Sequence, residues 1–139
     1  MNAKIAIATI CLFATASLVT AAGLAAPDSI DRVLFHPRTK QAALVLTVDR
    51  PLDVEENERR LQGKVDAYIS FVESGRLQAM YSHVDPNVQV LIAIVFEMPP
   101  PPLLLPKLLA TKAQLQQKGF EVRMQVYDQT INGLRNLEP

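Results

Sequence analysis

The architecture of this chain can be read from one run of residues, Val88-Gln89-Val90-Leu91-Ile92-Ala93-Ile94-Val95-Phe96. Nearly every side chain in the run is apolar, which is typical of a central strand buried on both faces of a sheet. Four prolines, Pro99 to Pro102, follow closely and favour a stiff, extended connector that ends the strand. The run therefore predicts a sheet with this segment near its middle.

Three further segments have the composition of strands. Residues 30–36 and 42–48 are rich in β-formers, and the polar, proline-containing segment between them predicts a β-hairpin. Residues 120–127 alternate apolar with polar side chains, which predicts a strand with one buried face and one solvated face.

Two helices are expected between the later strands. The apolar side chains of the first recur on one helical face and are Leu61, Val65, Tyr68 and Val72. Asp53 is the expected N-cap, with Glu56 completing a capping box, and Gly75 suits the helix end. The second helix is expected to have Pro106 in its first turn and to end before Gly119.

The predicted order is ββαβαβ, which belongs to an α+β or α/β two-layer sandwich. Right-handed crossovers between parallel strands give a four-stranded mixed sheet in the order 1-2-3-4, with two helices on one face. The other face then carries Leu91, Ala93 and Val95, or their opposite set. We expect this open, partly apolar face to dock a protein partner or a second copy, forming a homodimer. The alternative is that the tail or the hairpin covers it.

Residues 1–25 predict a secretory signal peptide. A short start with Lys4 is followed by an uncharged apolar run, and small residues come before the expected cleavage between Ala21 and Ala26. Three frames offer small or tolerated residues before a cut: Val19-Thr20-Ala21, Thr20-Ala21-Ala22 and Gly23-Leu24-Ala25. A single domain over residues 26–129 and a loose tail over residues 130–139 are expected to follow.

The signal peptide predicts a periplasmic or secreted protein. If the apolar run is not cleaved, it is long enough to tether the domain to a membrane. If the start codon is misassigned, the protein is cytoplasmic. The sole cysteine, Cys11, lies inside the apolar run, so the mature chain would contain no disulfide.

Composition and motifs argue against several functions. The 14 basic and 14 acidic side chains balance, so there is no basic field for nucleic acid. The sequence contains no glycine-rich phosphate loop and no G-x-S-x-G motif, so we predict no cofactor and no catalytic residue. His36, His83 and Asp85 lie near one sheet edge, but they lack a short metal-ligand spacing, and no metal is predicted.

The segment from Leu61 to Leu77, LQGKVDAYISFVESGRL, resembles the central helix of a family of small bacterial proteins of unknown function. The resemblance covers residues 29–127 and implies a fold but no activity. Two features depart from the family pattern. This chain has a secretory-type start, and it lacks a tryptophan at the entry to the helix.

One group of residues is a candidate ligand site. In parallel sheets, ligands bind outside the carboxyl ends of the strands. That edge is expected to gather Asp49, Arg50, Glu97 and Asp128, with Asp31 at the same edge. Several carboxylates around one arginine can bind a cation or a basic group. The alternative is that they are turn, cap and solvated strand-end residues.

These observations favour a non-enzymatic binding or interaction module of the bacterial envelope. A small hydrolase or metal-dependent enzyme that uses the carboxylate cluster is the first alternative. A domain tethered to the membrane by an uncleaved N-terminal helix is the second.

Overall fold

The computed structural model describes residues 14–16, 23–25, 29–36, 38, 41–81, 84–85 and 87–137, the first of these by backbone alone. The strands are β1 (Ala14–Ala16), β2 (Arg32–Phe35), β3 (Ala42–Val48), β4 (Val90–Phe96), β5 (Glu121–Asp128) and β6 (Gly133–Asn136). The helices are α2 (Glu55–Glu73), α3 (Arg76–Met80), the short 3-10 helix η1 (Pro102–Leu104) and α4 (Leu105–Gln117).

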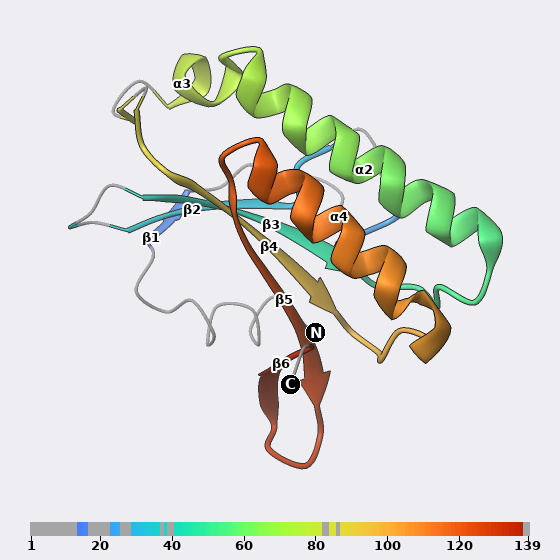
Figure 1. The fold of residues 1–139 in the computed structure, drawn as a ribbon. Helices are drawn as coiled ribbons and strands as arrows, with labels where there is room; N and C mark the ends of the chain where they lie inside the picture. Colours follow the sequence, from blue (N-terminus) through green and yellow to red (C-terminus); the bar gives the residue numbers. More distant parts are fainter. Residues whose placement is uncertain are drawn as a thin grey trace.

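The strands form one mixed sheet in the order β1-β2-β3-β4-β5-β6. β3, β4 and β5 are parallel, and the remaining neighbours pair antiparallel. α2 and α4 lie side by side on one face of the sheet (Figure 1). The predicted order of β2, β3, β4 and β5 is confirmed, and the structure adds one short strand at each edge.

The main core lies between the helices and the sheet. Ile92, Ile94 and Phe96 of β4 are all at most 2% exposed there, as expected for the central strand. They pack with Val65 and Phe71 of α2 in the same cluster. Burying a side chain of this size contributes about 1.5–3 kcal/mol, so this layer holds the helices on the sheet.

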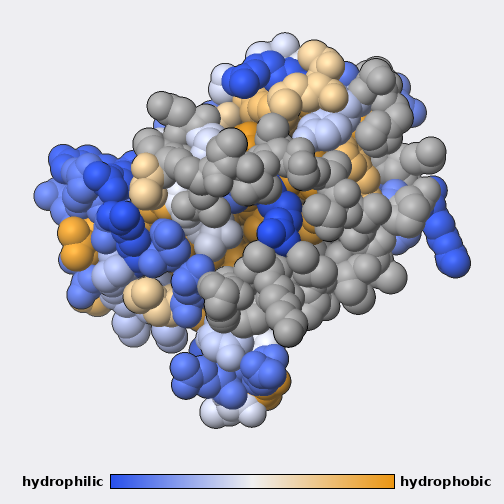
Figure 2. Space-filling model, turned by 180° about the vertical axis from the view of Figure 1, so that it is seen from behind, coloured by the Kyte–Doolittle hydropathy of each residue, from blue (hydrophilic) through white to orange (hydrophobic). Residues whose placement is uncertain are grey.

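The opposite face of the sheet carries a second apolar cluster. It consists of Leu34, Ala43, Val45, Leu91 and Val95. Figure 2 views the molecule from behind and shows hydrophobic atoms near the middle of this face. In the full-length chain the five side chains are buried, and Leu134 of β6 packs against them. Docking of a partner or a second copy on this face stays a prediction.

The tail predicted to be loose contains an ordered strand. β6 pairs with β5, with Leu134 opposite Tyr127, and Leu137 N–H donates to Met124 O at 3.0 Å. Asn132 takes the left-handed conformation that a tight turn needs, with φ of 49°. The β6 segment is only four residues long and has little apolar alternation, so its own sequence does not predict the pairing.

The start of α2 also differs from the prediction. Its N-cap is Val54, which makes no side-chain cap hydrogen bond, so the capping box is wrong. Glu56 instead forms ion pairs with Arg59 and Arg60. Asn57 anchors the turn by donating its side-chain amide to Pro51 O at 2.9 Å.

The predicted signal peptide lies largely outside the described residues. Of those described, Ala14–Ala16 form β1, while Gly23 and Leu24 are buried in the domain, with Leu24 fully enclosed. The described fold therefore includes residues of the predicted signal peptide, Ala14–Ala16 through strand pairing and Gly23 and Leu24 through burial. Within the described ranges, no helix has the length and apolar character needed to cross a bilayer.

Candidate functional site

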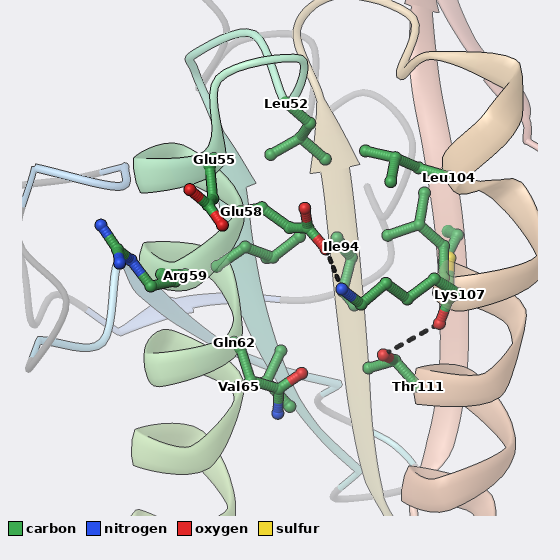
Figure 3. A pocket seen from close by; sticks show the side chains of 13 residues that line it. Leu52, Glu55, Glu58, Arg59, Gln62, Val65, Ile94, Leu104, Lys107 and Thr111 are labelled. Carbon is green, nitrogen blue, oxygen red and sulfur yellow. Dashed lines mark hydrogen bonds and ion pairs between the residues drawn. The ribbon is translucent and has the colours of Figure 1, made fainter.

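A groove between α2 and α4 encloses about 250 Å³ (Figure 3). Its floor is apolar and comes from several elements: Leu52, Leu61, Val65, Ile94, Leu104, Leu108 and Met124. Polar and charged side chains, including Gln62 and Thr111, also line it. The groove therefore offers an apolar interior with a polar border.

An ion pair crosses the mouth of the groove. Glu58 of α2 and Lys107 of α4 reach toward one another across it (Figure 3). Further along the same two helices, Lys118 and Glu73 form a second pair at 3.6 Å. Exposed pairs of this kind contribute about 0–1 kcal/mol, so breaking either pair costs little free energy.

The local sequence explains where this groove forms. Both helices connect parallel strands, so they run in the same direction over the sheet. Medium-sized polar side chains, Gln62 and Thr111, stand where large apolar ones would close the gap. The proline run sets the start of α4, which places Leu104 at one end of the groove (Figure 3).

Two of the predicted site residues come together at the carboxyl ends of the parallel strands. Asp49 follows β3, Glu97 follows β4, and Glu97 N–H donates to Val48 O at 3.0 Å. Burial raises the pKa of Glu97, and the nearby Asp49 carboxylate raises it further. Asp49 Oδ1 also accepts a hydrogen bond from Leu24 N–H at 3.0 Å.

The other two predicted site residues behave differently. Arg50 is exposed. Asp128 lies in the β5–β6 hairpin, where Thr130 N–H donates to it at 2.9 Å and Arg135 at 3.1 Å. The Thr130 hydrogen bonds and Arg135 lower the pKa of Asp128. The structure thus assembles the predicted cluster only in part.

A buried cation that the sequence analysis did not single out pairs with Asp31. Lys64 of α2 is fully buried and donates to both Asp31 Oδ1 and Gly23 O. Asp31 also accepts from Thr47 N–H at 2.8 Å and Gly23 N–H at 3.1 Å. The sequence does place Lys64 four residues before Tyr68, on the buried face of the helix, but it does not show the partner of Lys64.

Tyr68 completes this buried network. Its hydroxyl donates to Val45 O at 2.6 Å and accepts from Asp31 N–H at 2.8 Å. Burial raises the pKa of Asp31, while Lys64 and the backbone N–H groups act in the opposite direction. Burial and the Asp31 charge raise the pKa of Tyr68 well above its ordinary value, so the hydroxyl stays protonated.

Three residues that can ligate a metal ion lie near one edge of the predicted sheet: His36, His83 and Asp85. In the part of the chain that the structure describes, no three His, Cys, Asp or Glu side chains lie close enough to hold a metal ion. Of the residues considered, His36 and Asp85 are described, and His83 lies outside the described residues.

Comparison with known proteins identifies the family. The model of a family of unknown function, DUF6572, matches residues 23–128. The chain belongs to DUF6572. This match agrees with the resemblance seen in the central helix, and it assigns no activity. The DUF6572 region begins at Gly23, which is buried in the domain. No curated protein and no solved structure matches the chain.

Proposed function

We propose that this DUF6572 chain is a non-enzymatic interaction module of the bacterial envelope that binds an apolar side chain of a partner polypeptide in the α2–α4 groove. The observation that carries the proposal is the apolar floor of the groove beneath the Glu58–Lys107 pair. Protein interfaces combine a buried apolar centre with a polar rim, and this groove has both.

The size of the groove supports a side chain as the occupant. Pockets for drug-sized ligands and cofactors enclose about 300–1,000 Å³. The volume here, about 250 Å³, is smaller and suits one large anchoring side chain. A few such anchors supply most of the affinity of many protein interfaces.

The enzymatic alternative has less support from the described residues. Asp31 is held by Lys64, and Asp128 by its own hairpin. Asp49 and Glu97 remain as a pair of carboxylates, and the Asp49 side chain already accepts the Leu24 N–H. Enzymes that use two carboxylates need them aimed at a substrate site, and the groove is lined by neither residue.

The envelope location is supported by the N-terminal sequence, with its basic start, apolar run and small residues. Expression of the full chain in a Gram-negative host, followed by fractionation, tests this location. We expect the protein in the periplasmic or secreted fraction. Recovery in the cytoplasm alone would refute export.

The binding site is tested with N-acetyl-phenylalaninamide, titrated into the ¹⁵N-labelled protein and followed by NMR. We expect saturable shifts of amides around the groove, including those of Val65 and Thr111. Thr111→Phe should abolish these shifts by filling the groove. Gln116→Phe, which adds the same ring on an exposed position of α4, should leave them unchanged.

Two outcomes would count against the groove. The absence of saturable shifts, or shifts that persist in Thr111→Phe, would refute it. Shifts confined to Leu134 and its strand neighbours would instead favour the second apolar cluster as the docking surface, as the sequence originally suggested.

A further inference from the structure

We propose that the chain is cleaved between Ala22 and Gly23, and that the freed amino group of Gly23 then serves as a second buried cation beside Asp31 and Asp49. This inference rests on the export in the proposed function. It adds the cleavage position and assigns the new terminus a place in the fold.

Gly23 already lies between the two carboxylates. Its N–H donates to Asp31 Oδ1 at 3.1 Å, and the next residue, Leu24, donates its N–H to Asp49 Oδ1 at 3.0 Å. A Cβ on Gly23 would stand 2.2 Å from Asp49 Oδ2, so the Asp49 carboxylate is packed directly on the Gly23 backbone. An ammonium at the Gly23 nitrogen would therefore sit within reach of both acids.

The charges around Gly23 favour such a group. Asp31 and Asp49 accept the Gly23 and Leu24 N–H groups, and Lys64 pairs with Asp31. Tyr68 adds a neutral hydroxyl. An ammonium at Gly23 would place a second cation beside these two carboxyl groups. Buried carboxylates are stabilised when an added cation lies within hydrogen-bonding distance.

The packing decides among the three cleavage frames. A cut after Ala25 would remove Leu24, which is fully buried, and Gly23, whose carbonyl accepts from Lys64. In the frame Thr20-Ala21-Ala22, small side chains stand at the third and first positions before the cut. Cleavage after this frame keeps both Gly23 and Leu24 in the mature chain. The DUF6572 match also begins at Gly23, so both of these residues belong to the region that the family shares.

The reaction is the hydrolysis of one peptide bond by a leader-removing peptidase of the export machinery. Water supplies the hydroxyl group to the Ala22 carbonyl carbon and a proton to the Gly23 nitrogen, which takes up a further proton to become an ammonium. The Gly23 nitrogen then has three N–H donors in place of one. The cut also removes β1, a three-residue edge strand, and leaves β2 to β6.

The N-terminal mass of the full chain expressed in a Gram-negative host tests the position. We expect a mature protein that begins at Gly23. Ala25→Lys should not change this terminus, because it blocks only the frame that ends at the exposed Ala25. Ala22→Lys should abolish it. An exported protein that begins at Ala22 or Ala26 would overturn this inference and leave the proposed function intact, whereas an intact, cytoplasmic chain would overturn both.

The role of the new terminus has a separate readout. In the purified mature protein, the pKa of the Gly23 amino group should lie above about 8, the upper end of its ordinary range. The pH dependence of its reductive methylation measures this value. Asp49→Asn should lower the pKa, while Glu58→Gln, at the groove, should not change it. A pKa within the ordinary range, or one insensitive to Asp49→Asn, would overturn the proposed role.

Discussion

The ammonium group of Lys64 contacts the carboxylate of Asp31 in the protein interior, where 0% and 2% of the two side chains are exposed. The pair joins the residue just before β2 to the middle of α2. Because Asp31 also accepts the Thr47 and Gly23 N–H groups, the same carboxylate connects the helix, two strands and the N-terminal segment.

Replacing Lys64 tests how much this pair contributes. Lys64→Met leaves the Asp31 charge buried without its partner, which should lower the free energy of unfolding by about 3–5 kcal/mol. The double variant Asp31→Asn, Lys64→Met removes both charges and should recover part of the loss. Urea denaturation measures both. Additive losses in the double variant would show that the two groups do not interact.

Tyr68→Phe should lower the free energy of unfolding by about 1–3 kcal/mol, because it leaves Val45 O and Asp31 N–H buried without their partner. Tyr127→Phe is the matched control, since it removes an exposed hydroxyl that donates to Asn132. It should change stability by at most about 0.5 kcal/mol. Equal effects of the two substitutions on denaturation would contradict this account.

Two glycines should respond oppositely to alanine. Gly23→Ala places a Cβ against Asp49 at a φ of +83°, and the backbone conformation alone costs about 1–2 kcal/mol. Gly63→Ala adds a Cβ in open space within α2 and should stabilise the chain by about 0.5–1 kcal/mol. Thermal unfolding of the full-length variants compares them, and a Gly23→Ala variant as stable as wild type would be inconsistent with the packing.

The pH dependence of stability should reveal Glu97. In the full-length chain its pKa is raised from 4.5 by burial and by Asp49. Its stabilising contribution is thus present below the unfolded-state pKa and is lost as the pH rises through the folded-state value.

Glu97→Gln, which carries no charge, should therefore have a higher Tm than wild type near neutral pH. The difference should vanish as the pH falls below 4.5. A difference in Tm that is constant across this range would assign the effect to something other than the titration of Glu97.

The candidate site could be predicted in part. Asp49 and Glu97 were expected to meet because parallel strands bring their carboxyl ends to one edge, and they do. Asp128 was expected there too, but the antiparallel pairing of β6 carries it into a hairpin. Lys64 was missed because a lysine on an apolar helix face carries no mark of its partner, which lies 33 residues away.

The amino-acid sequence by itself determined the four strands β2 to β5, their order, and the helices α2 and α4, because apolar periodicity and crossover handedness act over short stretches of chain. Only the tertiary structure decided the Asp31–Lys64–Tyr68 network, the groove between α2 and α4, and the pairing of β6. These features join residues far apart in the chain. Their energies come from burial and from hydrogen bonds that exist only once the layers have packed.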